Sequence, residues 1–286
     1  MMHRKSVQIL AVGALAALPM LASAQSAADA AAAPAPNLTG NVSLTTNYKF
    51  RGQDQDVLGS NDFAKDGAVK PAIQGGLDYA FGSSGFYVGN WNSSVNWLKG
   101  NSIEMDFYGG YKFKGGPIDW DVGVLTYVYP GNSAGATTEI YGAGTWADDA
   151  IGAFTAKYSW TVSKDYFNYA GNKGGSGLEG TNTGYLNLAY SKEIIPKLTL
   201  KAAVGYTFFS SDIRSLGYKD YLDYNVGAAY DLGSGLSLGG YVQGGNQQSA
   251  FNLVSSPGIP TSIGPVGQTT FSPNATRFIL MLTKTL

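Results

Sequence analysis

Apolar and polar residues alternate with a period of two along most of the chain from residue 38, and no stretch keeps a helical period. This alternation predicts strands, because successive side chains of a strand point to opposite faces. Soluble strands usually have about 5 or 6 residues, whereas a tilted strand that crosses a membrane needs about 9 to 11. Twelve strands, most of them of membrane-crossing length, are predicted at residues 40–51, 70–81, 86–97, 102–113, 118–129, 138–147, 153–163, 183–192, 198–209, 221–232, 236–246 and 275–286.

The connections between the predicted strands alternate in length. Every second one is a tight turn rich in glycine and proline or otherwise short, at 82–85, 114–117, 148–152, 193–197 and 233–235. The others are mostly long, at 52–69, 164–182, 210–220 and 247–274, with an intermediate one at 130–137 and a short one at 98–101. Outer-membrane barrels have short periplasmic turns and longer extracellular loops. A soluble sandwich has no reason to sort its loops in this way.

The segment predicted over 86–97 raises the question of which strand face meets lipid. One of its faces carries Trp91, and the other carries Asn90 and Asn92. Aromatic residues on the apolar faces gather near the strand ends, in two belts separated by smaller aliphatic residues, which is typical of interfacial girdles. We therefore expect the Trp91 face to meet lipid and the face with Asn90 and Asn92 to line the lumen.

Together these features predict an all-β fold, a transmembrane up-and-down antiparallel β-barrel of about twelve strands. An open strand edge in hydrocarbon would leave unpaired backbone groups, so the last strand is expected to pair with the first. The alternative is a soluble secreted sandwich, whose mature chain would stay dissolved without detergent.

The N-terminus has the pattern of a secretory signal. His3, Arg4 and Lys5 form a basic start, followed by an apolar run at 7–22 and an Ala-Ser-Ala cleavage pattern at 22–24. The run is shorter than the roughly 20 residues of a membrane helix. The predicted organisation is a signal peptide at 1–24, an Ala/Pro-rich periplasmic lead-in at 25–37 and an outer-membrane barrel at 38–286. This organisation predicts export to the outer membrane of a Gram-negative bacterium.

Cysteine is absent, and His3, which the predicted cleavage removes, is the only histidine. These two facts exclude Ser-His-Asp and Cys-His catalysis and the common zinc sites from the mature chain. We therefore predict no enzymatic activity and no cofactor. Cleavage also removes Arg4 and Lys5, which leaves 17 of the 19 basic residues against 20 acidic ones, a net charge near −3 that does not favour nucleic acid.

Three weaker patterns receive structural interpretations. GSGLEG at 175–180 matches G-x-G-x-x-G, but no helix is predicted after it, so a flexible loop is favoured over a nucleotide site. The acidic loop at 52–69 could bind calcium, but a solvated loop is favoured. Two carboxylate pairs with the spacing of one strand face are interpreted as solvated lumen groups rather than a glycosidase pair, namely Glu104 with Asp106 and Asp119 with Asp121.

The predicted lumen face carries charges of both signs. They could create a transverse field that orients a polar solute, or they could form salt bridges that merely fill the barrel, and the sequence leaves both open. The residues predicted to line the pore are Lys49, Arg51, Asp78, Asn90, Asn92, Asp106, Lys112, Asp121, Lys157, Lys201, Asp223 and Asp231.

Several segments carry a family resemblance, namely NYKFRG at 47–52, KPAIQGGLDY at 70–79, GFYVGNWNS at 85–93, EMDFYGGYK at 104–112, DVGVLTYVYP at 121–130 and EIYGAGTW at 139–146. On these segments the chain resembles the TorF-type porin family of proteobacteria, which was first described only as conserved and of unknown function. The resemblance is strongest over the first half of the mature chain, and it implies an outer-membrane barrel without naming a substrate. Two departures are Asn47, where an acidic residue is expected, and the terminal Leu286, where such barrels usually end in Phe.

The leading functional hypothesis is a narrow outer-membrane channel for diffusion of small polar solutes. The alternative is a closed barrel whose extracellular loops bind a surface partner without transport, and an outer-membrane hydrolase is a third possibility that the missing histidine disfavours. The expected partners are outer-membrane lipid, a small polar solute and the barrel-assembly machinery during insertion.

Overall fold

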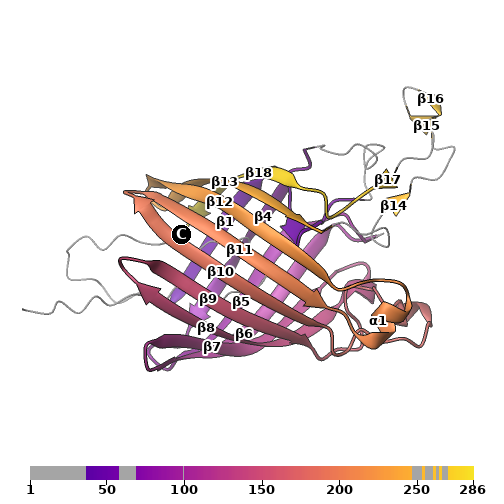
Figure 1. Cartoon of the computed structure of the whole chain (residues 1–286), viewed down its shortest axis with the longest axis horizontal. Coiled ribbons are helices and arrows are strands. Elements are labelled where there is room, and N and C mark those ends of the chain that lie inside the picture. Colours follow the sequence, from indigo (N-terminus) through magenta and orange to yellow (C-terminus); the bar gives the residue numbers. More distant parts are fainter. Residues whose placement is uncertain are drawn as a thin grey trace, which may run out of the picture.

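A computed structural model describes residues 37–57, 69–98, 100–246, 253–254, 260–261, 264–265 and 270–286. Within them, twelve antiparallel strands close into one barrel in the order β1-β18-β13-β12-β11-β10-β9-β8-β7-β6-β5-β4 (Figure 1). Closure is made by β1 and β18, which pair from Asn41 with Thr285 to Thr45 with Met281. The predicted fold class is therefore confirmed, including the pairing of the last strand with the first.

Each predicted strand overlaps one strand of the barrel. The barrel strands are β1 (Leu38–Thr45), β4 (Ala72–Ala80), β5 (Phe86–Ser94), β6 (Ile103–Gly115), β7 (Ile118–Val128), β8 (Thr137–Asp148), β9 (Gly152–Thr161), β10 (Gly184–Ile195), β11 (Leu198–Phe208), β12 (Tyr221–Gly233), β13 (Leu236–Gly245) and β18 (Arg277–Thr285). Short elements outside the wall are β2 (Lys49–Phe50), β3 (Gln53–Asp54), η1 (Ser133–Gly135), η2 (Asn172–Gly174), α1 (Ser211–Ser215), β14 (Leu253–Val254), β15 (Pro260–Thr261), β16 (Gly264–Pro265) and β17 (Thr270–Phe271).

The two ends of the barrel differ, as the parity of the connections predicts. The tight turns and Leu286 lie at one end, here called the short-turn end, and α1 lies at the other, the loop end (Figure 1). No helix in the described ranges is long and apolar enough to cross a membrane. The predicted signal peptide and nearly all of the predicted lead-in lie outside the described residues, as does most of the loops at 52–69 and 247–274.

The outer wall is apolar. Large hydrophobic side chains project from every strand of the barrel, and Ile73 (63% exposed) and Phe278 (66%) are among the most exposed. Monomeric soluble proteins rarely expose contiguous apolar surface on this scale. Closure of the barrel lets the backbone N–H and C=O groups of every strand form hydrogen bonds with a neighbouring strand. This apolar wall therefore meets the requirements for contact with hydrocarbon.

Tyrosine rings on the inner wall lie over glycines of neighbouring strands. Tyr87 pairs with Gly110, and Tyr141 pairs with Gly123. A Cβ on Gly110 would come within 2.7 Å of the Tyr87 hydroxyl, and one on Gly123 within 2.6 Å of the Tyr141 hydroxyl. A ring that covers a glycine shields its backbone and replaces the missing side-chain packing. This arrangement gives a physical role to part of the 39 glycines and 19 tyrosines of the chain.

The strand predicted over 40–51 is longer than the strand that the structure contains there. The strand predicted over 40–51 leaves the barrel wall after Thr45, and the following residues form β2 and β3, which pair with each other inside the barrel. Arg51 and Gly52 form the turn between them with φ values of 46° and 77°. Positive φ at both central residues is what a tight I′ hairpin turn requires. The period of two continues through β2, so the alternation alone does not reveal the change of direction.

Candidate functional site in the barrel lumen

Most of the residues predicted to line the pore do have side chains on the inner side of the barrel. They are Lys49 and Arg51 in the β2–β3 turn region, Asp78 on β4, Asp106 and Lys112 on β6, Asp121 on β7, Lys157 on β9, Lys201 on β11 and Asp223 on β12. Asp231 instead lies at the short-turn rim, where it is exposed and its carboxylate accepts the backbone N–H of Gly233.

The faces of β5 are the reverse of the prediction. Trp91 is 2% exposed and points inward, where its ring meets the ring of Tyr48 edge-on at 5.6 Å. Asn90 and Asn92 are half-exposed and share the outer face with Val88, which is 47% exposed. The prediction that Trp91 meets lipid and that the two asparagines line the lumen is therefore wrong. The interior is the more aromatic side of this strand because Trp91 packs into a buried cluster of rings.

The inner hairpin, defined as β2, β3 and their turn at residues 49–54, fills part of the loop-end half of the lumen. Its tip lies against the β12–β13 wall, because a Cβ on Gly52 would come within 2.8 Å of both the Asp223 Cβ and the Gly244 carbonyl oxygen. At its base, Lys49 pairs with Asp54 across the hairpin at 3.1 Å, and Arg277 of β18 pairs with Asp54 at 3.2 Å. The hairpin is thus fixed by buried ion pairs, one of them to the wall.

Arg51 extends from the tip of the inner hairpin to the other side of the barrel. Its guanidinium donates to both carboxylate oxygens of Glu139 on β8, at 2.9 and 2.7 Å, and to the Tyr166 hydroxyl at 3.0 Å. It also lies 4.1 Å from the ring centroid of Tyr185. Burial is the largest single influence and disfavours the charged guanidinium, but the Glu139 carboxylate and the nearby phenols of Tyr166 and Tyr127 together outweigh it, so the pKa of Arg51 is raised well above its usual value. The charge of Arg51 therefore persists in the folded protein.

A second buried group surrounds Glu104 on β6. The Tyr48 hydroxyl donates to one carboxylate oxygen at 2.7 Å, and the Tyr129 hydroxyl donates to the other. Burial and the nearby Glu104 raise the pKa of both phenols well above the usual value. Glu104 is fully buried and Asp106 is 2% exposed, so the prediction that this carboxylate pair is solvated is wrong. The Asp119 side chain is partly exposed at the rim, where it pairs with Lys114 at 2.9 Å.

Aromatic side chains complete the filling of the loop-end half. Phe167, from the connection between β9 and β10, packs against Phe50 of the inner hairpin at 5.1 Å and against Tyr127 of β7 at 4.9 Å between ring centroids. Tyr166 packs on Phe167 at 4.8 Å. The 175–180 segment that follows them has no strand or helix, and Gly180 donates to the Lys164 carbonyl, which agrees with the predicted loop.

Exposure of the inward side chains changes from one end of the barrel to the other. At the loop end Leu125, Thr161 and Thr207 are at most 1% exposed. At the short-turn end the inward residues of β8 to β13 are small and half-exposed, namely Thr145, Ala153, Thr155, Ala189, Ser191, Thr199, Ala203, Ala229 and Ser237. The lumen is therefore filled in its loop-end half and open to water in its short-turn half.

Charges of alternating sign follow the inner wall between these two halves. The Tyr108 hydroxyl donates to Asp78 at 2.7 Å, and the Tyr87 hydroxyl donates to Asp121 at 2.7 Å. Two lysines lie over tyrosine rings, Lys112 over Tyr87 at 4.6 Å and Lys157 over Tyr141 at 3.9 Å. This row of carboxylates, phenols and ammonium groups can hold polar solutes or water. In the described ranges, no cluster of three His, Cys, Asp or Glu side chains has the geometry of a metal site.

The predicted pore-lining set leaves out Glu139 and the inward tyrosines, and it also leaves out Glu104, which is predicted in the lumen only as a solvated carboxylate. Glu139 is the partner of Arg51, and Glu104 is the acceptor of two phenols. The alternation of the predicted strands at 102–113 and 138–147 places both carboxylates on the polar face, so a complete list of inward charges would have included them. No sequence signal indicates that they are bridged by a hairpin inside the barrel.

These features define the class of the protein as a closed antiparallel β-barrel with an apolar outer wall and a polar, partly filled lumen. The NanC porin shares 12% identity at a TM-score of 0.50, with coverage of 87% of this chain and 100% of that chain. The KdgM porin shares 10% identity at a TM-score of 0.49, with coverage of 86% and 98%. OprD from Pseudomonas aeruginosa shares 14% identity at a TM-score of 0.37, with coverage of 82% and 63%. The match to the NanC porin supports a likeness of fold only.

Residues 28–262 match the model of a family described as bacterial proteins of unknown function (Gcw_chp). The match spans more than half of the chain, and the chain belongs to this family. No curated protein matches the chain.

Proposed function

We propose that the chain is a channel of the Gram-negative outer membrane that passes small polar solutes by diffusion and is shut in the described conformation by the inner hairpin. The observation that carries the proposal is the open, polar short-turn half of the lumen inside a closed barrel. A barrel that served only as a rigid support would gain stability from a fully packed interior, as eight-stranded barrels do.

The charges along the lumen support a polar solute. Lys112 and Lys157 alternate with Asp78 and Asp121 around the wall, so a solute with separated charges or several hydroxyl groups would meet both donors and acceptors. Hydrocarbon-like solutes would lose contact with water and gain nothing in return. Charges of both signs line the same wall.

The location belongs to the same proposal. The basic and apolar start of the chain supports a cleaved signal peptide at 1–24, a lead-in at 25–37 and a barrel at 38–286, with insertion by the barrel-assembly machinery into outer-membrane lipid. The resemblance to TorF-type porins agrees with this assignment. Fractionation of a Gram-negative host followed by N-terminal sequencing should recover an outer-membrane chain that begins at Gln25, and recovery from the soluble periplasm would contradict it.

A second candidate function is favoured by the filled loop-end half. Because the inner hairpin and the 166–170 segment close that half, the barrel could present its extracellular loops to a surface partner without conducting. Under this alternative, substitutions in the loops abolish binding of the partner and substitutions in the lumen have no effect.

Conductance in planar bilayers decides between the two. The wild-type barrel should show rare, small conductance steps, and Arg51→Ala should make openings more frequent because it frees the hairpin from Glu139. Arg214→Ala is the matched control, since Arg214 lies in the loops and its ion pair with Asp220 is half-exposed. Silent bilayers for both the wild type and Arg51→Ala, with folded protein, would contradict the channel and leave the loop-binding function.

A further inference from the structure

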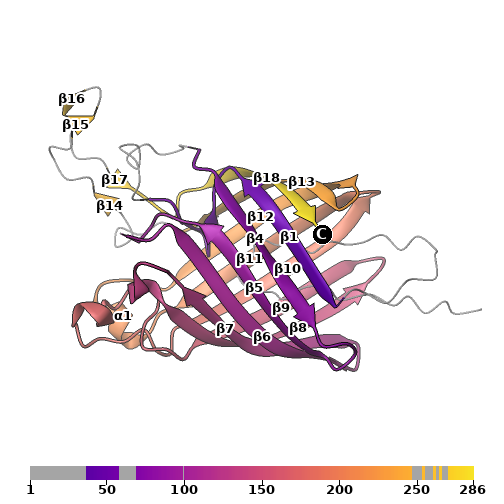
Figure 2. The same cartoon turned by 180° about the vertical axis from the view of Figure 1, so that it is seen from behind.

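The outer wall of β4 to β7 differs from the rest of the barrel surface. Away from the rims, the outward residues of β9 to β13, β18 and β1 are aliphatic, aromatic or glycine. Outward polar side chains instead belong to β5, β7 and β8. These strands lie on one side of the barrel (Figure 2). The side chains are Asn90, Asn92, Ser94, Thr126 and Thr138.

The two asparagines lie at the height of the hydrocarbon core. They are four and six residues beyond Phe86, which is exposed near the short-turn end. With a rise of about 3.4 Å per residue and a tilt of about 40°, this places them about 10 and about 15 Å into a band that is about 25 Å tall. Hydrocarbon offers no hydrogen-bond partner, and polar side chains at this depth are rare and usually functional.

Only part of the hydrogen-bonding capacity of these amides is used within the chain. Asn90 donates to the backbone carbonyl of Asp106 at 3.0 Å, and Asn92 donates to the side-chain oxygen of Asn90 at 2.6 Å and to the backbone carbonyl of Gly75 at 3.4 Å. The two threonines, by contrast, bond to each other at 3.1 Å. The amide oxygen of Asn92 is buried and has no hydrogen-bond partner in the described ranges, while both asparagine side chains are partly exposed. The second N–H of Asn90 has no acceptor in the described ranges and can donate to a group outside the chain, whereas the Asn92 oxygen becomes accessible only if its amide turns and gives up its own two hydrogen bonds.

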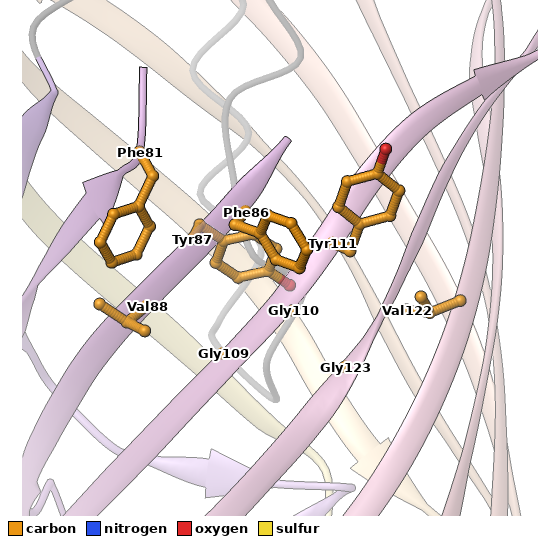
Figure 3. A pocket seen from close by; sticks show the side chains of 9 residues that line it. All are labelled: Phe81, Phe86, Tyr87, Val88, Gly109, Gly110, Tyr111, Val122 and Gly123. Carbon is orange, nitrogen blue, oxygen red and sulfur yellow. The ribbon is translucent and has the colours of Figure 1, made fainter. Parts of the chain in front are cut away.

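The same wall has a hollow beside two projecting side chains. The hollow lies over Gly109, with the side chains of Phe81, Phe86 and Tyr111 among those around it (Figure 3). Phe107, which is 47% exposed, projects from the same face of β6 two residues before Gly109. Leu77, which is 53% exposed, projects from β4, and both Leu77 and Phe107 pair with Asn90 across the sheet.

We infer that the β4–β7 face, defined as the outward residues Gly75, Leu77, Asn90, Asn92, Phe107 and the hollow over Gly109, is where two copies of this chain associate. An amide both donates and accepts, so this patch is complementary to a copy of itself, whereas acyl chains provide neither group. A two-fold arrangement places the same patch on both subunits. The projecting side chains of Leu77 and Phe107 on one copy can fit the hollow over Gly109 on the other. Gly75, which pairs with Asn92, has no side chain and lets the second copy approach the amide closely. The inference is independent of transport.

Crosslinking in vesicles tests the inference, because the chain has no cysteine and single introduced thiols report without background. Met105→Cys places a thiol on the β4–β7 face next to Asn92 and leaves both amides in place. Val204→Cys is the matched control, since Val204 is 39% exposed on β11, on the opposite side of the barrel. Oxidation should give a dimer for Met105→Cys and a monomer for Val204→Cys.

A second set of variants tests whether crosslinking depends on the two amides or only on where the thiol lies. Asn90→Leu with Asn92→Leu, in the Met105→Cys background, should remain folded and lose the dimer. Equal crosslinking at the two thiol positions would overturn the inference. So would a monomer that carries a bound phospholipid in native mass spectrometry and loses it on Gly109→Leu, because the occupant of the hollow would then be lipid.

Discussion

Arg51 and Glu139 form a bidentate ion pair inside the barrel, with both partners nearly inaccessible to solvent. Four strands, β4 to β7, separate β1 from β8 around the wall. The pair therefore connects a hairpin attached to β1 with the far side of the lumen. The turn that presents Arg51 requires a positive φ of 46° at a residue with a side chain, which is a strained conformation. The ion pair offsets this strain and fixes the position of the hairpin.

Removal of one partner should destabilise the barrel strongly. Arg51→Met leaves the Glu139 carboxylate buried without its cation, and Glu139→Met does the reverse, so each single substitution should lower the free energy of unfolding by about 3–5 kcal/mol. The double variant should recover much of the loss, because two apolar side chains of similar volume replace the pair. Urea titration of the barrel in lipid vesicles measures these differences. Additive losses in the double variant would show that the two residues do not act as a pair.

The phenols on Glu104 should make the barrel sensitive to alkaline pH. The pKa of Tyr48 and of Tyr129 is raised by burial and by Glu104, whereas the unfolded phenol ionises near pH 10. The folded state therefore keeps protons that the unfolded state releases, and the free energy of unfolding should be constant below about pH 10 and fall above it. Urea midpoints between pH 8 and pH 11 measure this slope. Tyr48→Phe with Tyr129→Phe should make the fall less steep, and an unchanged slope would exclude these two phenols as contributors.

The sequence was sufficient for the architecture because each requirement of a membrane barrel leaves a local trace. Strand length follows from the extent of the period of two, and the alternation of short and long connections is visible in the sequence between these segments. The structure agrees with both. The period of two does not show which face of a strand is inside when the outer face carries polar residues and the inner face carries a large aromatic residue. On β5 the outer face carries two amides and the inner face carries Trp91, so the rule that aromatic residues face lipid fails there.

The content of the lumen was less predictable because it depends on contacts between segments far apart in the chain. Lys49 and Arg51 were placed inside from their alternation, but the turn at Arg51 and Gly52 makes them part of an inner hairpin rather than of the wall. Glu139 lies 88 residues from Arg51, and their pairing depends on closure of the whole barrel. Local patterns carry no information on such a contact.

Fluorescence can report which face of β5 is inside. Trp91 is 2% exposed in the interior, whereas Trp160 on β9 is 45% exposed on the outer wall. Of the five tryptophans, a variant that keeps only Trp91 should resist quenching by brominated lipid, and one that keeps only Trp160 should be quenched. The remaining tryptophans are replaced by Phe in both variants. Strong quenching of Trp91 by the lipid would contradict the inward orientation.

The tyrosine–glycine pairs of the inner wall should be intolerant of added side chains. A Cβ on Gly123 would come within 2.5 Å of the Gly109 carbonyl oxygen and 2.6 Å of the Tyr141 hydroxyl, so Gly123→Ala requires the backbone or the ring to move. Overpacking of this kind typically costs about 1–3 kcal/mol, and we expect Gly123→Ala to lower the free energy of unfolding by that amount. Gly142→Ala is the matched control on the outer face of the adjacent strand, where the nearest atom to a new Cβ is a Val122 methyl at 4.0 Å. Urea titration in vesicles should give a midpoint near that of the wild type for the control. If both variants unfold at the wild-type midpoint, the ring of Tyr141 is free to leave Gly123, and the covering of glycine by tyrosine contributes little to the stability of this wall.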